Sequence, residues 1–117
     1  MPINYDNRAF RGRVNTDNGE VSDETRFHYR QEGARLWASY GGGSVITGHL
    51  LGHVNEDDSL EFVYHHINVD GELMAGRCCS TPTIESDGRL VMNESWQWMT
   101  GDQSAGTSQV EEVKDEA

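Results

Sequence analysis

The sequence is poor in several features that would assign it to a common functional class. Its only cysteines, Cys78 and Cys79, are adjacent, so on a strand they point to opposite faces and cannot form a disulfide framework. No apolar run approaches the roughly 20 residues of a membrane span, and no positive segment precedes an apolar stretch at the N-terminus. The net charge of −11 would repel phosphate backbones. We therefore expect a soluble cytoplasmic protein with no nucleic-acid or membrane partner.

A sustained apolar repeat at three-to-four spacing is also missing, whereas period-two alternation recurs from end to end. Turn signals rich in Gly, Asn and Asp divide the chain into segments. The 117 residues predict one domain, 1–117, whose acidic residues 111–117 fray into solvent. The predicted strands lie near residues 8–14, 22–31, 35–40, 44–54, 59–68, 72–81, 89–99 and 106–113.

Short connections between strands favour antiparallel pairing of sequential neighbours. Eight such strands hide their edges by closing into a barrel, so we predict an all-β, eight-stranded, antiparallel up-and-down barrel of the lipocalin or calycin type. The alternative is a two-sheet β-sandwich. A barrel of this size has an interior that is either filled by side chains or holds one small ligand.

Residues 90–98, L-V-M-N-E-S-W-Q-W, place a carboxylate among apolar side chains. Alternation puts Leu90, Met92, Glu94, Trp96 and Trp98 on one face of a half-buried strand. A buried carboxylate costs several kcal/mol unless it is paired or protonated, so Glu94 is either a satisfied structural group or part of a site.

The same parity predicts the inward-facing side chains of each of the remaining strands. Arg26, His28, Arg30, His49 and His53 point outward, as does His65. Glycines 48, 52 and 76 fall on inward faces, where they admit a neighbouring ring or leave space for a ligand. The inward set is Phe10, Val14, Phe27, Tyr29, Leu36, Ala38, Tyr40, Ile46, Leu50, Val54, Leu60, Phe62, Tyr64, His66, Met74, Gly76, Cys78, Ser80, Ser108 and Val110.

The polar members of this inward set could form one site. Apolar walls raise the pKa of a carboxyl group, so Glu94 is a candidate general acid or base, with His66 and Tyr64 as partners. Candidate ligand-binding residues are Tyr29, Tyr40, Phe62, Cys78, Ser80, Trp96 and Trp98. The alternative is a purely structural hydrogen-bonded network, since most buried polar groups are simply satisfied.

The five histidines do not predict a metal site. His49 and His53 are separated by roughly 13 Å along a strand, and His65 and His66 point to opposite faces. No convergent set of three ligands results, and no cofactor motif is visible. We therefore predict neither a metal nor a cofactor.

Four motifs carry a family resemblance: F-H-Y-R-Q-E-G at 27–33, G-H-L-L-G at 48–52, Y-H-H at 64–66 and E-S-W-Q-W-M-T-G-D at 94–102. Nearly the whole chain resembles small microbial proteins that often carry the label N-acetylglutamate synthase. The label implies an acetyltransferase, which usually binds the CoA pyrophosphate in R/Q-x-x-G-x-G/A before a helix. Residues 30–35 end in Arg35 instead, and a predicted strand follows, so the residues weigh against this activity.

Three functional hypotheses follow from the sequence. The leading one is a barrel that binds a small, partly apolar or aromatic molecule in its interior. The second is an isomerase, lyase or cyclase that uses Glu94 as acid or base with His66 and Tyr64. The third is a structural module in which an exposed strand face pairs two barrels into a homodimer.

Overall fold

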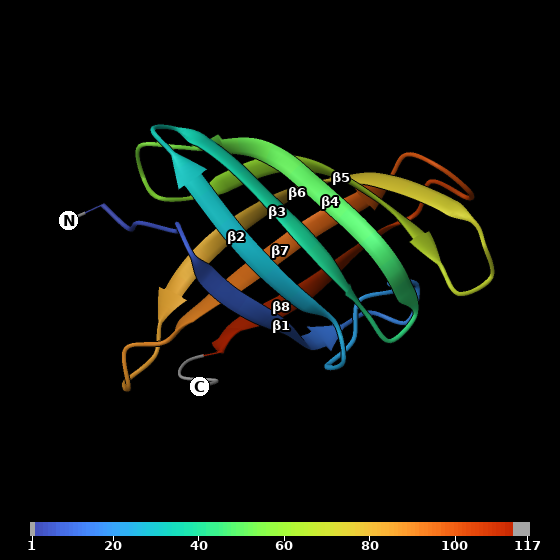
Figure 1. Cartoon of the computed structure of the whole chain (residues 1–117), viewed down its shortest axis with the longest axis horizontal. Coiled ribbons are helices and arrows are strands. Elements are labelled where there is room, and N and C mark those ends of the chain that lie inside the picture. The colour runs from blue at the N-terminus through green and yellow to red at the C-terminus, as the bar shows by residue number, and fades with distance from the viewer. Residues whose placement is uncertain (1, 114–117) are drawn as a thin grey trace.

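Eight antiparallel strands close into a barrel in the computed structural model, which describes residues 2–113 (Figure 1). Each strand pairs with the next along the chain, and β1 lies beside β8 to complete the circle. The predicted up-and-down barrel is confirmed, and the sandwich alternative is wrong. The strands are β1 (Arg8–Asn15), β2 (Arg26–Glu32), β3 (Arg35–Gly42), β4 (Val45–Val54), β5 (Leu60–Asn68), β6 (Leu73–Ile84), β7 (Leu90–Trp98) and β8 (Ala105–Val113).

Most connections are tight turns at the expected Gly, Asn and Asp clusters. Between β3 and β4, Gly42 (φ 114°) and Gly43 (φ 64°) both adopt backbone conformations that residues with a Cβ avoid. The connection from β1 to β2 is the exception, because β2 begins at Arg26 and not near residue 22. Residues 16–25 therefore form a loop, which we call the β1–β2 loop. Within residues 2–113 there is no helix that could span a membrane.

Two β-bulges overturn part of the predicted facing of side chains. The register of β1 shifts between Gly12 and Val14, and that of β4 shifts between Val45 and Thr47. Each bulge adds one residue to its strand, which reverses the parity on one side of it. Val14 and Ile46, predicted to face inward, are consequently 57% and 60% exposed.

The core otherwise follows the predicted alternation, with the inward aromatic and aliphatic side chains buried and the arginines and histidines predicted to point outward exposed. An unpredicted member of the core is Tyr5, which precedes β1 and is fully buried. Its backbone N–H donates to Gln31 Oε1 (2.8 Å), its hydroxyl donates to the carbonyl of Asp58 (2.6 Å), and its ring lies near Tyr29. Tyr5 therefore helps to close the barrel interior next to the β4–β5 turn.

The expected frayed tail of residues 111–117 needs correction where the structure describes it. Residues 111–113 are the last of β8, and both glutamates there are buried. Arg11 donates to Glu111 (2.7 Å) and Arg8 to Glu112 (2.8 Å), both across the β1–β8 closure. These ion pairs offset the cost of burying two carboxylates at the seam of the barrel. Residues 114–117 lie outside the described residues.

Candidate functional site

The barrel interior contains a cavity next to the β1–β2 loop. The centres of water molecules could occupy about 40 Å³ of it, within about 450 Å³ of atom-free space that includes its mouth. This is room for a small ligand, since one buried water needs roughly 10 to 15 Å³ on the first of these measures. The wall consists of Asn15, Gly19, Glu20, Val21, Phe27, Tyr40, Leu50, Phe62, Tyr64, His66, Cys78, Glu94, Trp96, Trp98 and Ser108.

Aromatic rings from four strands dominate this wall. Trp96 and Trp98 meet edge to face, with ring centroids 5.5 Å apart, and Trp98 meets Tyr64 in the same way at 5.7 Å. Phe62 lies edge-on to Tyr64, while Phe27 stacks on Tyr40 at 4.9 Å. Rings arranged in this way present both edges and electron-rich faces to the space between them.

The inward glycines serve ring packing. A Cβ at Gly48 would lie 2.5 Å from the Tyr40 ring and 2.6 Å from His66, and one at Gly76 would collide with the Tyr64 hydroxyl. Of the two uses foreseen for these glycines, the structure therefore selects the close approach of a neighbouring ring.

Glu94 is the acidic group at the centre of β7. Its pair partners are Ser80 on β6 and Ser108 on β8, and the Ser108 hydroxyl donates to Glu94 Oε1 at 2.8 Å. Burial raises the pKa of Glu94 from 4.5 to about 7, and the bond from Ser108 opposes this only in part. The carboxyl group borders the cavity and exchanges its proton near neutral pH.

Two phenols and one thiol in the wall are neutral in that range. Burial is the largest cause that raises the pKa values of Tyr40, Tyr64 and Cys78, and the negative charge of Glu94 adds to it in each case. The phenols and the thiol therefore stay protonated at physiological pH. A thiol held in this form is not an activated nucleophile.

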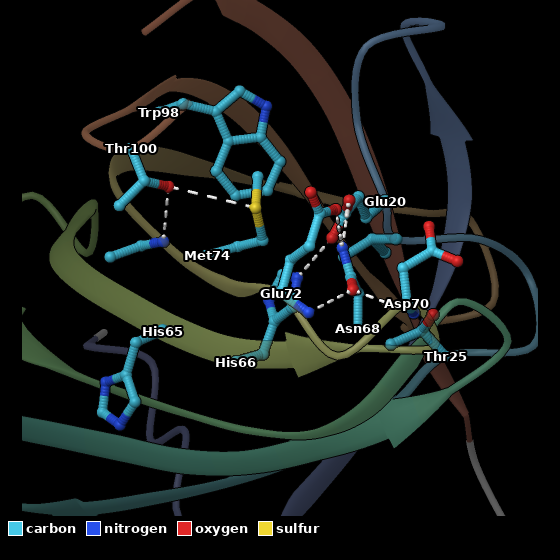
Figure 2. A network of polar contacts seen from close by, with 12 residues as sticks. Glu20, Thr25, His65, His66, Asn68, Asp70, Glu72, Met74, Trp98 and Thr100 are labelled. Carbon is cyan, nitrogen blue, oxygen red and sulfur yellow. Dashed lines mark hydrogen bonds and ion pairs between the residues drawn. The ribbon is translucent and has the colours of Figure 1, made fainter. Parts of the chain in front are cut away.

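Glu20 is one of the residues that attach the β1–β2 loop to the barrel. Figure 2 shows Glu20 reaching two residues of β5: its Oε1 lies 2.7 Å from His66 Nε2, and its Oε2 accepts a bond from Asn68 Nδ2 at 3.0 Å. The other ring nitrogen of His66, Nδ1, lies 2.8 Å from the Tyr40 hydroxyl. A continuous chain of hydrogen bonds thus runs from the loop to a side chain in the cavity wall. His65, the preceding residue, points to the opposite side of the strand.

A second attachment of the same loop is made by Asn18. The indole Nε1–H of Trp98 donates to the carbonyl of Asn18 at 3.0 Å. The side chain of Asn18 in turn donates to Ser104 Oγ and to the carbonyl of Ala105, both at 2.9 Å. The two attachments lie close together, because the rings of His66 on β5 and Trp98 on β7 meet edge to face with centroids 5.9 Å apart.

Eight of the ten candidate residues from the sequence line the cavity: Tyr40, Phe62, Tyr64, His66, Cys78, Glu94, Trp96 and Trp98. The remaining two, Tyr29 and Ser80, are fully buried outside its wall. Within the described part of the chain, neither hydroxyl has a hydrogen-bond partner. The roles assigned to these residues stay predictions.

Sequence reasoning missed the part of the wall that comes from the β1–β2 loop. Phe27, Leu50 and Ser108 were predicted to face inward, but Glu20 and Val21 were not, because they lie between the turn at 17–19 and the strand predicted at 22–31. No alternation marks residues 16–25, so only the excess of Asp, Asn and Gly at 17–19 signalled a loop. Among residues 2–113, no three His, Cys, Asp or Glu side chains are placed to hold a metal ion.

One comparison with known proteins gives a match. A family model described as avidin-like protein matches residues 3–113. No curated protein and no solved structure matches the chain.

The resemblance to proteins labelled N-acetylglutamate synthase is therefore wrong, since nothing in the comparisons points to that enzyme. The structure gives the physical reason. Gly33 forms the turn between β2 and β3, and the following residues, from Arg35, are a strand. No helix N-terminus is present there to bind a pyrophosphate.

Proposed function

The chain belongs to the avidin-like protein family, and from that premise we propose that it binds a small, partly apolar or aromatic molecule inside its barrel. The family binds small ligands such as biotin. The observation that carries the proposal is the cavity itself, whose wall combines six aromatic rings with two carboxyl groups, those of Glu20 and Glu94. Apolar walls with a few convergent polar groups are typical of small-molecule sites.

Intrinsic fluorescence tests this proposal because Trp96 and Trp98 line the cavity. We expect saturable quenching by at least one member of a set comprising biotin, indole and benzyl alcohol. Cys78→Leu replaces one sulfur atom in the wall by three carbon atoms, whereas Cys79→Leu makes the same change on the exposed face of the same strand. Binding should be lost in the first variant and kept in the second. Binding that survives Cys78→Leu, or no binding at millimolar concentration, would contradict the proposal.

A second candidate function, proton transfer on the bound molecule, is favoured by the pKa of Glu94, which lies at about 7 beside the cavity. A carboxyl group with such a pKa can act as both acid and base at neutral pH. His66 and Tyr64 lie in the same wall and would orient the substrate. Incubation of a bound molecule in D₂O should then give deuterium incorporation that Glu94→Gln abolishes. Equal incorporation with and without protein would exclude this function.

Association of two barrels is a proposal about assembly that rests on the outer face of β3, β4 and β5. Trp37, Leu51 and Val63 are neighbours in one row there and are 38%, 62% and 50% exposed. A continuous apolar row favours contact with another chain more than scattered apolar residues do. Sedimentation should show a dimer that Leu51→Glu dissociates and that Leu73→Glu, on an exposed residue outside the row, leaves intact. A monomer at all concentrations would refute it.

A further inference from the structure

We infer that the molecule bound in the barrel is a small organic cation, an amine or alkylammonium group on a short apolar skeleton. This inference rests on the interior binding proposed above and adds the chemical class of the ligand. Its basis is the unbalanced charge of the cavity wall. Glu94 and Glu20 are both in that wall, whereas none of its described residues is Lys or Arg.

Glu94 is the carboxylate that lacks a counter-charge. Its single hydrogen bond comes from the neutral Ser108 hydroxyl, and no cationic side chain among residues 2–113 forms an ion pair with it. An ionised buried carboxylate without a partner is costly, so the free protein keeps it partly protonated. A ligand cation would supply the missing charge.

The aromatic rings around Glu94 favour the same class of ligand. Trp96, Trp98 and Tyr64 form a continuous edge-to-face series, and Tyr40 and Phe62 complete the wall. Ring faces are the negative part of an aromatic quadrupole and attract ammonium groups within about 6 Å, most strongly where water is excluded. An anionic ligand would be repelled by these ring faces and by the two carboxylates. The net charge of −11 also raises the local concentration of cations.

The protonation of Glu94 makes the inference quantitative. Only the ionised form pairs with a cation, and about a tenth of Glu94 is ionised at pH 6 but about nine tenths at pH 8, given a pKa of about 7. Apparent affinity for a cation should therefore rise about tenfold over this range. The titratable groups around Glu94 are Tyr29, Tyr40, Tyr64, His66, Cys78 and Glu20. Burial keeps the phenols and the thiol protonated, and comparison of the wild type with Glu94→Gln isolates the contribution of Glu94.

Isothermal titration calorimetry on the full chain with three matched probes tests the ligand class. Benzylamine is cationic, benzyl alcohol is its neutral counterpart, and benzoate is anionic. At pH 8 we expect benzylamine to bind at least tenfold more tightly than benzyl alcohol, and benzoate to bind most weakly. Glu94→Gln should equalise benzylamine and benzyl alcohol and remove the pH dependence. Glu56→Gln, which removes an exposed charge in the β4–β5 turn, should change neither.

The contrary outcomes separate the two proposals. If benzyl alcohol or benzoate binds as tightly as benzylamine and Cys78→Leu abolishes that binding, the ligand class is wrong while interior binding stands. A preference for the cation or a pH dependence that persists in Glu94→Gln would have its source outside Glu94 and would also overturn the inference. If none of the three probes binds, both the ligand class and the proposed function fail.

Discussion

Replacing Glu94 with Gln should make the folded protein more stable at alkaline pH. In the fold, burial holds the pKa of Glu94 at about 7, whereas the ordinary value is 4.5. The folded state therefore retains a proton that the unfolded state has already released between these two values. The stabilisation is fully present below pH 4.5 and is lost as the pH rises through 7. Gln has the same shape and still accepts the Ser108 bond, but it does not titrate.

The magnitude follows from the two pKa values. The difference between them, at about 1.4 kcal/mol per pH unit, amounts to about 3 kcal/mol, most of which falls between pH 5 and pH 8. We therefore expect the wild-type protein to lose about 2 kcal/mol more than Glu94→Gln over that range. This is a large fraction of the roughly 5 to 15 kcal/mol that stabilises a typical domain.

Urea unfolding at pH 5 and pH 8, followed by circular dichroism, measures this difference. All other titratable groups are present in both proteins, so their contributions cancel in the comparison. Glu56→Gln is the control for removing a charge from an acidic protein, and it should follow the wild type at both pH values. Parallel pH profiles for Glu94→Gln and the wild type would show that Glu94 is ionised in the fold, and the reasoning would fail.

Three further predictions follow from single contacts. A thiol reagent should label the exposed Cys79 in the native protein and should reach Cys78 only on unfolding, because Cys78 is buried and burial raises the pKa of its thiol. Equal labelling rates would place both thiols at the surface. Gly48→Ala should lower stability by roughly 1 to 3 kcal/mol in thermal unfolding, because its Cβ would lie 2.5 Å from the Tyr40 ring, and an unchanged melting temperature would contradict this. Trp98→Phe removes one hydrogen bond to the β1–β2 loop, so amide exchange should accelerate at residues 16–25 and stay unchanged in β4.

The sequence was sufficient for the barrel and for most of its interior because strand parity is a local property. Glu94, His66 and Trp98 could be assigned to one interior from alternation and turn positions alone. The orientations of Val14 and Ile46 could not be predicted in this way, because Val14 follows the bulge in β1 and Ile46 lies within the bulge in β4. The extra residue of a bulge leaves no mark on the hydrophobic pattern.

The contacts of Glu20 lay beyond sequence reasoning for a different reason. Its partners His66 and Asn68 are 46 and 48 residues away, and a loop residue has no periodicity from which its direction can be inferred. Tyr5 was missed likewise, since it precedes the first strand and reaches Asp58 across the barrel end. Side chains on regular strand segments could be placed from the sequence, whereas those that cover the ends of the barrel could be placed only from the structure.

The attachment of the β1–β2 loop at both Glu20 and Trp98 has a kinetic consequence for any ligand wider than the present cavity. Such a molecule can pass the mouth only while the loop is lifted, and lifting it breaks hydrogen bonds to two strands of the barrel, β5 and β7. Its association rate would then reach a ceiling set by loop opening, common to strong and weak ligands. The residence time of the ligand would depend on how long the loop stays closed. Its affinity for the aromatic walls would set only the fraction of barrels with a closed loop that contain a ligand.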